Sequence, residues 1–155
     1  MRTLLIVFFI LTSLQAKMFQ SVTQQQAHIL QKGKEARYCS SCGMDLVKFY
    51  KTSHAAKVNG KMKQFCSIHC LAETIKNGAE VTDIQVVDAK TLNWIDAKKA
   101  YYVVGSKVKG TMSHVSKYAF AAKADAENFV KKHGGKIMNF EKALEIAKKD
   151  FKHKR

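Results

Sequence analysis

The chain has 155 residues but no proline, and beyond residue 16 it has no apolar run of 18 residues. Without proline, turns have to be located from glycine and asparagine. Without a long apolar run, the body of the chain has no segment that would cross a membrane as a helix. It also lacks a phosphate-binding glycine loop, a nucleophile elbow and paired carboxylates, which mark many enzymes. With 46% hydrophobic residues, the chain is instead expected to form one globular, non-enzymatic domain with its own core.

The N-terminal stretch has the layout of a secretory signal. Arg2 supplies a positive start, a short apolar run follows, and the small residue Ala16 ends it. No cysteine comes directly after the run, as it would in a lipoprotein signal. We therefore expect residues 1–16 to be a signal peptide that directs export, with an uncleaved membrane anchor as the alternative.

The formal net charge is +15, from 27 basic and 12 acidic residues. A basic domain often binds nucleic acid, but an exported chain rarely meets it, so we expect no nucleic-acid partner. The charge favours docking on an acidic protein or peripheral contact with an anionic membrane face. The alternative is a solvated, lysine-rich surface without a dedicated partner.

The pattern of apolar residues predicts an α+β fold. Residues 17–37 are polar and are expected to be a lead-in, either a short helix or a mobile segment outside the core. Asn59-Gly60 is typical of a tight hairpin turn, so antiparallel strands should flank it. After Phe65 the spacing changes to that of a helix, which Gly78 stops, and a strand follows.

The second half repeats this order of elements. The stretches FCSIHCLAETIKNGAEV and FAAKADAENFVKKHGGKI match in pattern. We infer two related strand-strand-helix-strand units with antiparallel sheets, over about residues 38–90 and 91–140, that share a core. A C-terminal helix should close the fold, with five apolar residues on one side: Phe140, Ala143, Leu144, Ala147 and Phe151.

All four cysteines lie in two close pairs, Cys39-x2-Cys42 and Cys66-x3-Cys70. In an exported chain they could form disulfides, within each pair or between the pairs. Two pairs separated by a hairpin could instead surround a tetrahedral metal ion, and this spacing alone does not separate zinc from copper. Thiol–disulfide exchange at the first pair is a third interpretation, but no clear long helix follows Cys42.

Two methionines could add sulfur to these thiols. Met44 follows Cys42 by two residues, and Met112 lies in a glycine-containing loop between two predicted strands. Cu(I) is a soft ion that prefers thiolate and thioether ligands, so these methionines favour copper. The alternative is that each fills space in the core.

Three histidines are weaker candidates for metal ligands. His69 comes three residues after Cys66, His54 lies in a predicted strand, and His114 comes two residues after Met112. For His69 the alternative is a place on the surface.

Four stretches together carry a resemblance to a known family: YCSSCGM, NWIDAKKAYYVVGS, VKGTMSHVSKYAF and FVKKHGGKI. Over about residues 38–140 the chain resembles the NosL family, accessory proteins of nitrous oxide reductase that bind Cu(I) in the bacterial periplasm. The resemblance implies a fold of two related strand-and-helix units and places metal ligands on Cys42, Met44 and Met112. Family members are usually anchored through an N-terminal cysteine, and many have one cysteine in the metal segment, so this chain departs at both points.

We therefore predict a periplasmic Cu(I) metallochaperone that delivers copper to nitrous oxide reductase and is not an enzyme. A structural or sensing zinc module is the alternative, and zinc could also share the thiols with copper. The domain should span residues 38–155, and the sequence indicates no oligomeric state. The predicted metal site has six sulfur-bearing residues: Cys39, Cys42, Met44, Cys66, Cys70 and Met112.

Overall fold

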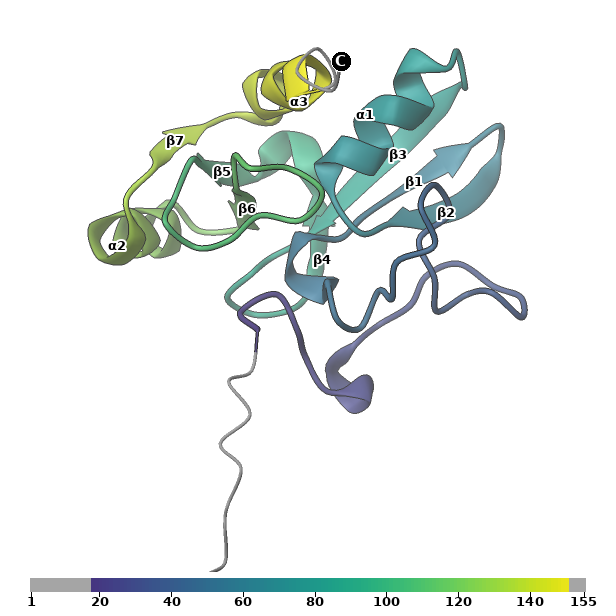
Figure 1. Ribbon diagram of the computed structural model, residues 1–155, viewed down its shortest axis with the longest axis horizontal. Helices are drawn as coiled ribbons and strands as arrows, with labels where there is room; N and C mark the ends of the chain where they lie inside the picture. Colours follow the sequence, from purple (N-terminus) through teal and green to yellow (C-terminus); the bar gives the residue numbers. More distant parts are fainter. Residues whose placement is uncertain (1–17, 151–155) are drawn as a thin grey trace, which may run out of the picture.

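The computed structural model of the protein describes residues 18–150, so the predicted signal peptide lies outside it. The described chain forms two antiparallel sheets with helices packed against them (Figure 1). The first sheet has the strand order β2-β1-β3-β4. Its strands are β1 (His54–Val58), β2 (Lys61–Phe65), β3 (Val81–Val87) and β4 (Trp94–Asp96). Within residues 18–150, none of the helices combines the length and apolar character that a membrane-spanning helix needs.

The predicted hairpin is confirmed. β1 and β2 pair in antiparallel register, with Val58 opposite Lys61, and Asn59-Gly60 forms the turn. Asn59 has φ 47° and Gly60 has φ 76°, the two positive values that a tight hairpin turn requires. The predicted helix follows as α1 (Ile68–Lys76), and the chain then returns as β3.

The second sheet has the order β6-β5-β7 and carries the second predicted helix. Its strands are β5 (Tyr101–Val104), β6 (Lys117–Phe120) and β7 (Lys136–Met138), and α2 (Lys123–His133) connects the last two. Gly134 ends α2 with φ 71°, and its N–H donates to the carbonyl of Val130.

The two halves share the topology predicted from the repeat. In each, the first strand is central and pairs with the second and third, and the helix lies between the second and third. One apolar cluster contains Ala56 and Val86 from the first sheet and Tyr102 and Ala119 from the second, so the core is common to both. β4 was not predicted, because three residues are too short to show an alternating pattern.

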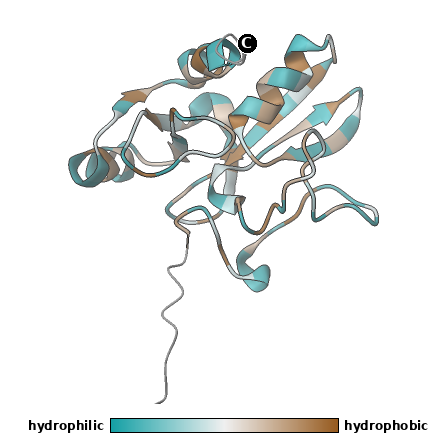
Figure 2. Ribbon diagram, viewed as in Figure 1, coloured by the Kyte–Doolittle hydropathy of each residue, from teal (hydrophilic) through white to brown (hydrophobic). Residues whose placement is uncertain are grey.

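The predicted C-terminal helix is α3 (Phe140–Lys149), which packs against α1. The side chain of Asn139 caps its start by accepting from the N–H of Lys142. Phe140, Ala143 and Ala147 are buried, as expected, whereas Phe151 lies outside the described residues. Hydrophobic and hydrophilic bands alternate along both α1 and α3 (Figure 2). Each helix therefore has one face suited to the core and one suited to water.

The lead-in was wrongly predicted to stay outside the core. It forms only one short 3-10 turn, η1 (Gln24–Gln26), but Val22 and Gln31 are buried. The amide oxygen of Gln31 accepts hydrogen bonds from the Ser40 hydroxyl and the Gln64 N–H, at 2.6 and 2.8 Å. This amide thus connects the first cysteine segment to β2, a contact that no local sequence pattern could indicate.

Candidate metal centre

Cys39 and Cys42 are held in one tight turn. The N–H of Cys39 donates to the carbonyl of Met44, and the N–H of Gly43 donates to the carbonyl of Cys39, both at 2.9 Å. Gly43 has φ 73°, a left-handed conformation that glycine adopts without steric strain. The backbone N–H of Cys42 also donates to the Cys39 side chain. The turn therefore fixes the first pair and favours a thiolate at Cys39.

Cys66 and Cys70 lie where β2 passes into α1. Cys66 directly follows β2, and Cys70 is in the first turn of the helix. Between them Ser67 is extended, with φ −163° and ψ 167°, and turns the chain from strand to helix. The start of a helix has free N–H groups and a positive dipole end, which stabilise thiolates.

The four sulfur atoms converge on one point. The Sγ atoms of Cys39, Cys42, Cys66 and Cys70 all lie within 4.8 Å of one another. The Sγ of Cys66 is 3.5 Å from that of Cys42 and 3.7 Å from that of Cys70. Four thiolates bound at about 2.3 Å around a tetrahedral ion are roughly 3.8 Å apart. All four are free thiols rather than disulfides, and their spacing fits a single ion.

The thiols share their protons unequally. Hydrogen bonds from the side chains of Cys66 and then Cys70 hold the pKa of Cys39 far below that of an ordinary thiol. The hydrogen bond to Cys39 raises the pKa of both Cys66 and Cys70, and burial raises both further. One thiolate is therefore stabilised, whereas additional negative charge in the cluster is opposed. A bound cation would supply the positive charge that the remaining thiolates need.

Burial differs among the four thiols. Cys39, Cys66 and Cys70 are buried in the apolar cluster with residues such as Leu46, whereas Cys42 is exposed. The candidate site is thus closed towards the core and reachable at one sulfur.

Both predicted methionines pack against the apolar cluster that contains the three buried cysteines, and both are partly buried. Met44 belongs to the first cysteine turn, whereas Met112 lies in the segment between β5 and β6, which we call loop 105–116. Met112 has φ 58°, which is uncommon for a residue other than glycine. A Cβ on Gly110 would lie 2.7 Å from the carbonyl oxygen of Ser113, so the loop needs glycine there.

Two threonines connect loop 105–116 to the second cysteine pair. The hydroxyl of Thr52 is 2.8 Å from the carbonyl oxygen of Cys66 and 2.8 Å from the hydroxyl of Thr111. Thr52 and Thr111 are buried, so these bonds are shielded from water. The hydroxyl of Thr52 therefore links Thr111, the residue before Met112, to the backbone of Cys66.

A cavity of about 480 Å³ lies beside this connection. Its lining includes His69, Met112, His114 and Asp150. The expectation that His69 lies on the surface was wrong, because the first turn of α1 is covered and His69 is only 3% exposed. His114 lies within loop 105–116 and is exposed.

His54 belongs to the core rather than to the thiol cluster. Its Nδ1 is 3.1 Å from the carbonyl oxygen of Thr52, and its Nε2 is 3.0 Å from the hydroxyl of Tyr102. Burial lowers its pKa to about 4, so the ring is neutral at pH 7. Because both ring nitrogens are engaged inside the core, this geometry does not support His54 as a copper ligand.

Comparison with known proteins places these features in a family. A family model described as NosL matches residues 31–147, which include all four cysteines and Met112. The copper-binding lipoprotein NosL of Stutzerimonas stutzeri is 32% identical over 114 residues, which are 66% of this chain and 60% of that protein. This chain thus aligns with less than two thirds of that relative.

Two solved structures are also similar. The crystal structure of the copper chaperone NosL from Shewanella denitrificans has 26% identity and a TM-score of 0.58, over 72% of this chain and 92% of that one. The solution structure of apo-NosL from Achromobacter cycloclastes has 24% identity and a TM-score of 0.40, over 57% and 82% of the two chains. The fold and the family match together lead to one conclusion: this chain belongs to the NosL family.

Proposed function

We propose that this protein binds Cu(I) with its cysteine cluster and passes the ion to an acceptor copper enzyme. The observation that carries the proposal is the convergence of four free thiols within 4.8 Å. A set of thiolates matches a soft monovalent ion. The relatives from Stutzerimonas and Shewanella, described as copper-binding and as a copper chaperone, support copper as the cargo.

Met44 and Met112 would complete the ligand set as thioethers. Both lie against the cluster that holds the buried cysteines, and the backbone of Met112 adopts a conformation that is costly for its residue type. Thioethers are neutral, so they add affinity for Cu(I) without adding negative charge to a buried site. In this scheme the cysteines provide charge and the methionines adjust affinity.

Transfer would begin at Cys42, the exposed thiol of the four. A sulfur of the acceptor could reach the ion from this side and replace Cys42, while the buried thiols keep holding the ion. Each step then exchanges one ligand for another, and free copper is never released.

The acceptor in this proposal is nitrous oxide reductase, and the compartment is the periplasm. The relative described as a lipoprotein supports the location, and the charge of +15 supports an acidic docking face on the acceptor. The protein itself would act as a carrier and catalyse no reaction.

Zinc is the second candidate cargo, because a tight turn and a helix start that supply four thiols are typical of structural zinc sites. A zinc module would hold the ion permanently and would gain nothing from Met112. The two functions therefore differ in whether Cu(I) displaces zinc and in whether the methionine matters.

The experiment compares Cu(I) affinity across three variants of the reduced protein under anaerobic conditions. Competition with a chromogenic Cu(I) chelator should show weaker binding for Cys42→Ser and for Met112→Leu. Met138→Leu is the matched control, since Met138 is partly buried against the same cluster but lies in β7. Tightly held zinc that Cu(I) does not displace would refute the copper proposal and support the zinc module.

A further inference from the structure

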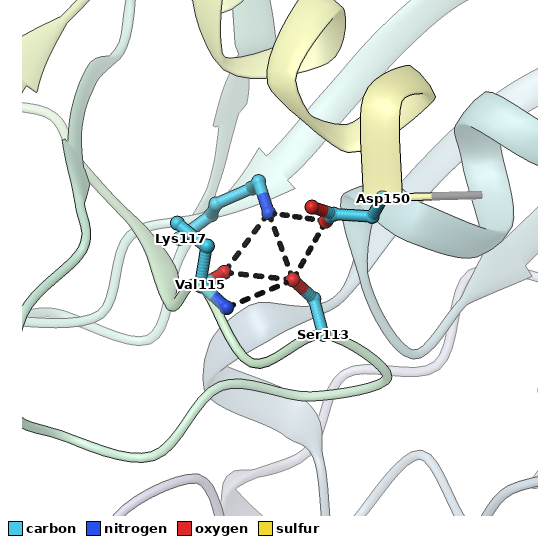
Figure 3. Close-up of polar contacts among 4 residues, drawn as sticks. All are labelled: Ser113, Val115, Lys117 and Asp150. Carbon is cyan, nitrogen blue, oxygen red and sulfur yellow. Dashed lines mark hydrogen bonds and ion pairs between the residues drawn. The ribbon is translucent and has the colours of Figure 1, made fainter. Parts of the chain in front are cut away.

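A buried lysine lies at the base of loop 105–116. The side chain of Lys117, the first residue of β6, is only 3% exposed. Its ammonium group donates to the carboxylate of Asp150 at 2.8 Å, to the carbonyl of Val115 at 2.9 Å and to the hydroxyl of Ser113 at 3.1 Å (Figure 3). All three donors of the ammonium group are used, so its position is fixed from three directions.

Ser113 and Asp150 complete the arrangement. The hydroxyl of Ser113 donates to the same carboxylate oxygen at 2.6 Å and accepts from the N–H of Val115 at 3.1 Å. Asp150 is the C-cap of α3, so these bonds join loop 105–116 to the end of that helix. We call this group of Ser113, Lys117 and Asp150 the clasp.

The clasp connects Met112 to the helix pair beside the cysteines. Ser113 is the next residue after Met112, and α3 packs against α1, which carries Cys70. Asp150 also lines the cavity that Met112 lines. On the other side of Met112, Thr111 is bonded to Thr52. Met112 is thus held between two anchors, one on each neighbouring residue.

Such anchoring has a physical reason at this position. A left-handed backbone at a methionine is unfavourable unless the surroundings impose it. A buried lysine paired with a partly buried carboxylate is also expensive to desolvate and does not by itself stabilise a fold. An ion pair in such a place is better explained by the fixed geometry that it imposes on the loop.

We propose that Lys117 and Asp150 are positioning residues that fix the backbone at Met112 and so determine how strongly this methionine contributes to Cu(I) binding. The proposal rests on the proposed function, because it requires Met112 to act as a copper ligand. Neither Lys117 nor Asp150 touches the ion in this scheme. Each acts through the loop, as the outer partners of metal ligands do.

Asp150→Asn tests the proposal, because it removes the charge and keeps the size of the side chain. Cu(I) affinity of the full chain, measured by chelator competition, should weaken about tenfold. Glu145→Gln is the matched control: it removes one carboxylate from α3, where Glu145 pairs with Lys149 on the exposed face, and should leave the affinity unchanged. Asp150→Glu should restore part of the affinity. If Asp150→Asn does not fold, Ser113→Ala replaces it, because that variant keeps the ion pair.

A double-mutant cycle separates positioning from general destabilisation. In a Met112→Leu background, Asp150→Asn should cause no further loss of Cu(I) affinity, because the contribution that it controls is already gone. An equal loss in both backgrounds would show a structural role only and overturn the proposal. If Met112→Leu weakens binding but Asp150→Asn does not, the clasp proposal alone fails. If Met112→Leu has no effect, the copper role of Met112 fails and the clasp proposal with it.

Discussion

Thr52→Val is predicted to uncouple loop 105–116 from the cysteine cluster. Valine has nearly the same shape as threonine, so the change removes a hydroxyl and little packing. That hydroxyl joins the carbonyl of Cys66 to the hydroxyl of Thr111, with both contacts at 2.8 Å. Its loss leaves one buried hydroxyl and one cysteine carbonyl without their shared partner.

The expected loss follows from the burial of these groups. Thr52 is 3% and Thr111 is 5% exposed, so water does not readily replace the missing bonds. A buried polar group that loses its partner costs about 1–3 kcal/mol. We therefore expect the free energy of unfolding to fall by about 2–3 kcal/mol. Replacing Thr111 as well removes the orphaned hydroxyl, so the double variant should lose less than the sum of the single losses.

The assay is urea denaturation of the reduced, metal-free protein, followed by circular dichroism at pH 7. Thr82→Val is the control, since Thr82 is exposed on β3 and should change stability by less than about 0.5 kcal/mol. Losses for Thr52→Val and Thr111→Val that simply add would refute the coupling described here. So would a Thr52→Val variant as stable as the control.

Three further predictions concern acid stability, the cysteine turn and partner docking. Because burial lowers the pKa of His54 to about 4, the unfolded chain binds a proton at this residue between pH 6.5 and about 4 and the folded protein does not, so the free energy of unfolding should decrease by about 3 kcal/mol as the pH is lowered through this range. In His54→Gln, this part of the dependence of the unfolding free energy on pH should be missing. The same pH dependence in both proteins would contradict the assignment. Gly43→Ala should lower the free energy of unfolding by about 1–2 kcal/mol, because φ is 73° there, whereas Gly43→Asn should lose less; equal losses for the two variants would argue against backbone strain. Copper transfer to a purified apo-acceptor should slow as salt rises, because a charge of +15 steers docking, and a salt-independent rate would exclude an electrostatic docking face.

The elements that could be predicted are those with a local cause. Asn59-Gly60 specifies its turn whatever surrounds it, and the helical spacing after Phe65 is visible in the sequence. The cysteine spacing likewise indicated two pairs of thiols on either side of a hairpin that could meet at one point. The repeat extended this reasoning to the second sheet. In each case the residues that determine the structure are neighbours in the chain.

The remaining features depend on contacts between distant residues. Lys117 and Asp150 are 33 positions apart, and Thr52 and Thr111 are 59 apart, so no spacing rule connects them. The burial of His69 depends on what covers the start of α1. Gln31 is one of many polar residues in the lead-in, and the hydrogen bond from the Gln64 N–H of β2 to its amide oxygen joins residues 33 positions apart.

X-ray absorption of the protein loaded with one equivalent of Cu(I) tests the central claim most directly, because it identifies the atoms bound to the ion. Convergence of the cysteine sulfurs predicts a first shell made only of sulfur. Substituting Cys66 by serine should alter that shell. A shell dominated by nitrogen or oxygen, or one unchanged in Cys66→Ser, would show that the ion binds elsewhere.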